Sequence, residues 1–414
     1  MAFKQARPAP TGLQLMEAVE TNNFELVRVL VRNGADIDTR GLHGETPLIK
    51  SMMCEDPRIC RFLLDAGANV SIATQNGYGP LSFAALQNNF EYVRTLLLHG
   101  ASPNQKTSDG WTPLLIASTN SSIFYDNTDQ VFFRRLVEIV YKYSKYHPDY
   151  NPVRIVTMLL SSGADPNEPN IFGTTPLMAA AGMGNSGIMS QLLESHAALD
   201  SRDSEGKTAL MYAVIGSIEE LIDSQIHLHL VSSAIRMTDF LTPSLIGDLR
   251  QYYEPKKEQC VHQLIENGAR IQMKDNRGIS VLMHAARTGN LAVIKTLIAN
   301  GADIHEKSSR GVTALYAAAL NGHADIVEFL LRQGVDIECA LNDGETPLMA
   351  AVWNGQVGTV DLLLRMGASV KARKIIPYKP SGDPGLIWAA HRHQNEMDEK
   401  YDLIFRMLAD AGAE

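Results

Sequence analysis

Short apolar segments recur along the chain at a nearly constant interval, and each begins with a helix-capping motif. The motif is Thr-Pro-Leu or a close variant, and its copies begin at Thr46, Gly79, Thr112, Thr175, Thr208, Ser280, Thr313 and Thr346. The steps between these residues are 33, 33, 63, 33, 72, 33 and 33. Thr is a good N-cap and Pro suits the first helical position, so each copy predicts a helix start. The Leu and the Ala residues that follow then fall on the buried face.

A second marker keeps the same rhythm and predicts where a second helix ends. A glycine precedes a small residue, usually Ala, at Gly34, Gly67, Gly100, Gly163, Gly268, Gly301 and Gly367. Glycine is the residue that most readily ends a helix in a left-handed conformation. Two markers in constant phase with a period of 33 residues indicate a stacked repeat protein.

The repeated unit resembles the ankyrin repeat. The resemblance is plainest in Ser309–Ala318, which reads Ser-Arg-Gly-Val-Thr-Ala-Leu-Tyr-Ala-Ala, and continues through Gly322-His323, Ile326-Val327 and Leu330-Leu331. It implies an all-α repeat solenoid, in which each unit is a β-turn finger followed by two antiparallel helices. One departure is consistent: where the family often has His after Thr-Pro-Leu, this chain has mostly Met or another apolar residue, so the usual Thr–His hydrogen-bond network is not expected.

We count ten units, which would form one elongated repeat domain over residues 12–414 after a flexible lead-in over residues 1–11. A stack of this kind extends in one dimension, so its length does not require several globular domains. Three insertions interrupt the period, at about 121–152, 217–256 and 371–382. The sequence leaves open whether the chain is a piece of a longer protein.

The first two insertions fall at the same type of turn and are expected to leave one edge of the stack, where they would form a side lobe. Apolar residues at helical spacing beside basic ones over 132–146 favour a lengthened repeat helix over a docking helix for an acidic partner. The four basic residues of 371–382 favour a solvated loop over a phosphate-binding finger or an import signal.

Composition narrows the classes of function. A net charge of −9 argues against general nucleic-acid binding. No stretch approaches the ~18 apolar residues of a membrane span, and the first residues lack the apolar core of a secretory signal. We therefore expect a cytoplasmic protein, with a nuclear location as the alternative, and a monomer.

Neither a metal site nor a cofactor is expected. The cysteines, Cys54, Cys60, Cys260 and Cys339, form no Cys-x-x-Cys pair, which fits a reducing compartment and argues against a disulfide framework. His227 and His229 stand two residues apart, so on a helix they point in different directions rather than toward one metal ion.

Two groups of residues are candidates for binding a partner. The residue after each finger glycine is expected to face the concave groove, which would place Tyr78 and Trp111 beside Phe172 of the next finger. Aromatic residues are favoured at interface hot spots, although packing between fingers explains them equally well. The second group, Trp353 with His391 and Arg392, would anchor a carboxylate or a peptide.

The sequence carries no phosphate-binding loop, nucleophile elbow, zinc-protease motif or kinase catalytic loop. We therefore expect a protein-interaction scaffold or adaptor, rather than an enzyme, that binds another protein of unknown identity along its groove. The alternatives are a substrate-receptor subunit of a larger complex and a sensor of a small phosphorylated ligand.

Overall fold

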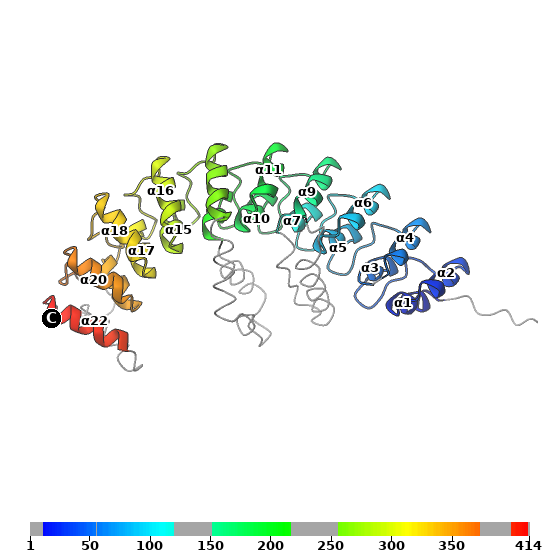
Figure 1. The fold of residues 1–414 in the computed structure, drawn as a ribbon, viewed down its shortest axis with the longest axis horizontal. Helices are drawn as coiled ribbons and strands as arrows, with labels where there is room; N and C mark the ends of the chain where they lie inside the picture. The colour runs from blue at the N-terminus through cyan, green and yellow to red at the C-terminus, as the bar shows by residue number, and fades with distance from the viewer. Residues whose placement is uncertain (1–10, 55, 120–150, 217–255, 373–398, 413–414) are drawn as a thin grey trace, which may run out of the picture. The chain divides into compact units, whose positions relative to one another are not determined.

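The computed structural model describes residues 11–54, 56–119, 151–216, 256–372 and 399–412. The chain divides into two compact units, Met1–Ala198 with Ile222–Leu241, and Leu199–Leu221 with Thr242–Glu414. In the described ranges, the regular secondary structure consists of helices, and the one β-bridge joins Lys274 to Ser280 (Figure 1). The predicted all-α repeat fold is confirmed.

The first unit alternates the inner helices that follow the fingers with outer helices that follow a tight turn. Its helices are α1 (Gly12–Glu20), α2 (Phe24–Arg32), α3 (Pro47–Ser51), α4 (Pro57–Asp65), α5 (Pro80–Leu86), α6 (Phe90–Leu98), α7 (Pro113–Ser118), α9 (Pro152–Ser161), α10 (Pro176–Gly182) and α11 (Ser186–Glu194). Within this unit, an inner helix packs on its own outer helix and on the next inner helix, as α5 does on α6 and α7.

The second unit repeats this arrangement. Its helices are α12 (Ala209–Ile215), a helix over 256–266, α15 (Val281–Thr288), α16 (Leu291–Ala299), α17 (Ala314–Asn321), α18 (Ala324–Arg332), α19 (Pro347–Trp353), α20 (Val357–Arg365) and α22 (Glu399–Asp410). The inner helices α12, α15, α17 and α19 contact one another in that order. Fully buried Ala residues, such as Ala285, Ala286 and Ala318, let their backbones approach closely.

The predicted caps are present at the start of the inner helices. A Thr or Ser hydroxyl accepts a hydrogen bond from the backbone N–H three residues on, at Thr46, Thr112, Thr175, Thr208, Ser280, Thr313 and Thr346. Each bond satisfies one of the donors that a helix start leaves without a partner. The capping residues are themselves almost fully buried, which explains why the motif is so regular in sequence.

The fingers are tied to one another by backbone hydrogen bonds. In neighbouring fingers, the N–H of the second finger residue donates to the carbonyl of the third residue of the preceding finger, at distances of 2.8–3.3 Å. The bonds are Gln75 to His43, Ser108 to Asn76, Ile171 to Asp109, Asn276 to Glu205, Ser309 to Arg277 and Asn342 to Arg310. Within each unit, these bonds fix the register of successive fingers. We call this series of bonds the finger ladder.

The finger glycines are required by the ladder as well as by the turn. Gly77 has a φ of +80°, and a Cβ added there would lie 2.7 Å from the backbone N of Ser108 in the next finger. A side chain at this position would strain the turn and also push the next finger away. The glycine therefore serves two repeats at once.

Some predictions of organisation fall on residues outside the described ranges. The three insertions lie there, except for residues 151–152, 256 and 371–372. Thr11, the last residue of the predicted lead-in, caps α1 through a capping box with Gln14. The count of ten repeats and their union in one domain remain predictions.

The inner helix α5 provides a test of the capping argument. Its N-cap is Gly79, which has no side chain that could accept a hydrogen bond from a backbone N–H of the first turn. A Cβ at Gly79 would lie 2.4 Å from the amide oxygen of Gln105, whose Nε2 donates to the carbonyl of Ser71. We expect Gly79→Thr to destabilise the native chain, because the Thr displaces Gln105. In a Gln105→Ala background the same change is expected to stabilise by about 0.5–1 kcal/mol. Urea unfolding of the four chains measures this double-mutant cycle, and equal effects of Gly79→Thr in both backgrounds would contradict it.

Candidate functional site

Six of the described fingers are small turns closed by the side chain of their first residue. The hydroxyls of Thr74, Thr107 and Ser308 accept a hydrogen bond from the backbone N–H four residues on. Asn170, Asp203 and Asp275 use one side-chain oxygen to accept from the N–H groups both two and four residues on. These bonds hold the finger in one conformation before any partner arrives.

The expectation that the residue after the finger glycine faces an open groove is wrong. Tyr78 and Trp111 are only 6% and 7% exposed. The ring of Tyr78 packs against Phe83 of α5, with ring centroids 5.8 Å apart. At the same position in the other units, Glu45 is buried and the remaining residues are half-buried. Side chains here lie between the finger and the helix that follows it, so Tyr78 and Trp111 belong to the packing of the stack.

The other predicted site residues are distributed differently. Phe172, at the third position of its finger, is half-buried. Trp353 ends α19 and is 39% exposed, and its carbonyl accepts a hydrogen bond from the hydroxyl of Tyr401 at 3.2 Å. His391 and Arg392 lie outside the described residues. The predicted grouping of Trp353 with these two residues stays a prediction.

The side chains that the fingers do expose stand at their second and third positions. In the first unit, Leu42 is 88% exposed and Ile171 is 61% exposed, whereas Gln75 and Ser108 hold the same second position in the fingers between them. Large apolar side chains this exposed on a rigid turn are suited to insertion into a partner. Leu42 and Ile171 were not among the predicted site residues. The sequence analysis pointed to this edge of the repeats only through the nearby Tyr78, Trp111 and Phe172.

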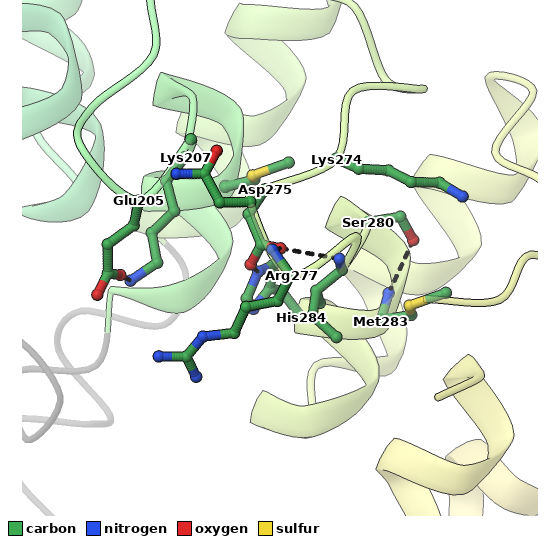
Figure 2. A network of polar contacts seen from close by, with 12 residues as sticks. Glu205, Lys207, Lys274, Asp275, Arg277, Ser280, Met283 and His284 are labelled. Atoms are coloured by element: carbon green, nitrogen blue, oxygen red, sulfur yellow. Dashed lines mark hydrogen bonds and ion pairs between the residues drawn. The ribbon is translucent and has the colours of Figure 1, made fainter. Parts of the chain in front are cut away.

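In the second unit, two acidic finger residues bind a side chain of the following inner helix. Asp203 Oδ2 accepts a hydrogen bond from the Tyr212 hydroxyl of α12 at 2.8 Å. In the next finger, Asp275 Oδ2 lies 3.1 Å from His284 Nε2 of α15, and both side chains are less than 10% exposed. Figure 2 shows this Asp275–His284 contact, with Arg277 extending away from His284. Tyr212 and His284 occupy the same place in successive repeats.

The environment of this pair makes His284 a neutral donor. Burial lowers the pKa of His284, and nearby Arg287 and Lys207 lower it further, against the opposing effect of Asp275. Burial alone would raise the pKa of Asp275, but hydrogen bonds from His284 and from the N–H groups of Ile279 and Arg277 outweigh it and leave this pKa lowered. The pair is therefore a carboxylate accepting from a neutral imidazole, which ties finger to helix.

A third contact of this kind joins neighbouring repeats. The hydroxyl of Tyr316, in the slot where the family often has His, donates to Glu345 Oε1 of the next finger at 2.9 Å. Burial raises the pKa of Tyr316, and the Glu345 carboxylate raises it further. None of these three contacts was predicted, because an isolated His or Tyr in a repeat motif is no signal without its neighbour in space.

The four cysteines lie within the described residues, and burial disfavours their reactive thiolate form. All four thiols are free, and burial raises the pKa of Cys60 to about 11 and that of Cys260 to about 12. Within the described ranges, no three His, Cys, Asp or Glu side chains gather closely enough to hold a metal ion. The helices described there are too short or too polar to cross a membrane.

Comparisons with known proteins agree with the architecture. A family model described as "Ankyrin repeats (3 copies)" matches residues 15–107, 147–230, 253–340 and 282–374. Over 75 residues the chain is 41% identical to the glycerophosphocholine phosphodiesterase gde1 of Schizosaccharomyces pombe. That alignment covers 18% of this chain and 7% of the phosphodiesterase, so this chain spans only a small part of that relative.

The Asp275–His284 pair predicts a pH-dependent stability. Below its ordinary pKa of about 6.5, the unfolded His284 takes up a proton that the folded one resists, so stability falls as the pH drops from 7 toward 5. We expect His284→Tyr to keep the contact with Asp275, as Tyr212 does with Asp203, and to reduce this fall. His284→Leu is expected to cost about 2 kcal/mol at neutral pH, because the Asp275 carboxylate loses a hydrogen bond. Urea unfolding at both pH values measures these effects, and an unchanged pH dependence in His284→Tyr would refute the assignment.

Proposed function

We propose that this chain, which belongs to the ankyrin repeat family, is a protein-interaction scaffold that binds its partner along the exposed edge of the fingers. The observation that carries the proposal is the finger ladder. It holds successive fingers in register within each unit, so their exposed second and third residues form a surface that is ordered before binding. A surface already ordered loses little conformational entropy on association.

The exposed apolar residues of the first unit support a protein as the partner. Leu42 and Ile171 sit on turns whose backbone is fixed by hydrogen bonds, and each would bury apolar area in a contact with another chain. We therefore place the interaction at the finger tips and not at Tyr78 and Trp111, whose side chains are already covered. The substrate-receptor role is one form of this proposal, since such a subunit also presents a binding surface.

The proposal includes a non-catalytic role and a cytoplasmic location. The partial likeness to a phosphodiesterase covers 7% of that protein, which is too little to transfer its activity. A sensor of a small phosphorylated ligand is less well supported, because it requires stacking against Tyr78 and Trp111, and both rings are buried.

The finger edge is tested by exchanging its exposed apolar residues for serine. We expect Leu42→Ser/Ile171→Ser to lose at least tenfold in affinity for the partner that the intact chain captures from native extract, with no loss of stability, because both side chains already face water.

The matched control is Val29→Ser/Leu98→Ser, which changes similarly exposed apolar residues on the outer helices α2 and α6. It is expected to retain the partner. Capture of the same partner by both double variants would place the binding surface elsewhere, and recovery of no protein by the intact chain would count against the scaffold itself.

A further inference from the structure

The finger edge of the second unit carries an ordered pattern of charge. At the third finger position, successive fingers present Glu205, Arg277, Arg310 and Asp343. The two arginines are exposed, and they stand at the same place in adjacent fingers. Two basic side chains are thus flanked on each side by an acidic one.

The backbone beneath the two arginines is fixed. The carbonyl of Arg277 accepts hydrogen bonds from both the N–H and the hydroxyl of Ser309, and the carbonyl of Arg310 accepts from the N–H of Asn342 at 3.1 Å. The Asn342 side-chain amide also donates to the Ser309 carbonyl at 2.9 Å. These bonds hold the two arginine backbones in a constant relation to each other.

The guanidinium groups of these arginines are available to a partner. Within the described part of the chain, neither Arg277 nor Arg310 forms a side-chain hydrogen bond or an ion pair. Other basic residues nearby are engaged: Lys207 binds Glu205 at 2.5 Å and Lys274 binds Glu306 at 2.8 Å. A guanidinium offers a planar pair of donors that matches a carboxylate.

The spacing of the repeats sets the spacing of the groups that fit them. Neighbouring helices pack about 8–10 Å apart, so equivalent residues of adjacent fingers recur at about that interval. A segment in the polyproline II conformation advances about 3.1 Å per residue and has three residues per turn, so residues three apart lie on one face at about the same interval. Carboxylates three residues apart on such a segment would meet Arg277 and Arg310 together.

We propose that the second unit binds a protein segment in the polyproline II conformation, in which two acidic residues stand three apart and a basic residue follows three further on at either end. The inner acidic residues pair with Arg277 and Arg310. One outer basic residue faces Asp343, and the other lies beside Glu205, whose carboxylate also binds Lys207. Because the pattern is the same read from either end, the segment fits in both directions. The inference rests on the proposed scaffold function and specifies one partner chemistry for it.

The test uses the full chain and two fluorescein-labelled peptides of identical composition, with proline and serine at the uncharged positions to favour the polyproline II conformation. One peptide carries lysine, glutamate, glutamate and lysine at every third position, and its isomer carries glutamate, lysine, lysine and glutamate. In low-salt buffer we expect the first peptide to bind about tenfold more tightly by fluorescence anisotropy, with the preference shrinking as salt is added. Equal binding of the two peptides, or binding of neither, would overturn the inference.

Charge-reversal variants locate the preference. Arg277→Glu/Arg310→Glu is expected to abolish it or to invert it toward the isomer. The control Arg332→Glu/Arg365→Glu makes the same change in net charge on the outer helices α18 and α20, and is expected to keep it. A preference that survives in the first variant, or disappears in the control, would refute the assignment to the fingers.

The outcome is separable from that of the proposed function. A partner captured through Leu42 and Ile171, together with equal binding of the two peptides, would leave the scaffold proposal standing and remove only the charge pattern. Binding of the first peptide without capture of any protein from extract would support the charge pattern and count against the scaffold proposal.

Discussion

The interaction on which the rest of the structure depends is the hydrogen bond between neighbouring fingers. Helix packing alone sets how far apart the repeats stand, but it leaves the turns at their edge free to tilt. A bond from the second residue of one finger to the third residue of the preceding one removes that freedom. It also leaves both side chains outside the bonded backbone, so a rigid turn can carry almost any residue at its tip. The same hydrogen bond therefore keeps the backbone of successive fingers regular while their exposed side chains differ from repeat to repeat.

The sequence predicts the scaffold in detail because the scaffold depends on local rules. Thr46, Thr208 and Thr346 predict the starts of their helices because Thr is a good N-cap. The glycines that follow the outer helices predict where those helices end. Exposure could not be read in the same way. Tyr78 is covered because the finger folds back over α5, and that depends on how the turn packs against a helix rather than on its own position in the repeat.

The polar contacts between finger and helix were missed for a related reason. Asp275 and His284 are nine residues apart, and neither is unusual in its own motif, so only the folded repeat shows that they meet. The net charge of −9 argues against a generally basic surface. It says nothing of an edge where Arg277 and Arg310 occur in successive fingers. In a repeat protein, charge is better judged position by position than as a sum.

The buried thiols give this protein a property that concerns its motions rather than its partners. Cys60 lies in the first unit and Cys260 in the second, and burial suppresses the reactive thiolate form of both. An alkylating reagent therefore modifies either one only when its repeat opens. Since each thiol belongs to a different compact unit, each modification rate measures how often the repeat that holds it opens. Similar rates would indicate that both units open equally often, and unequal rates that one unit opens before the other.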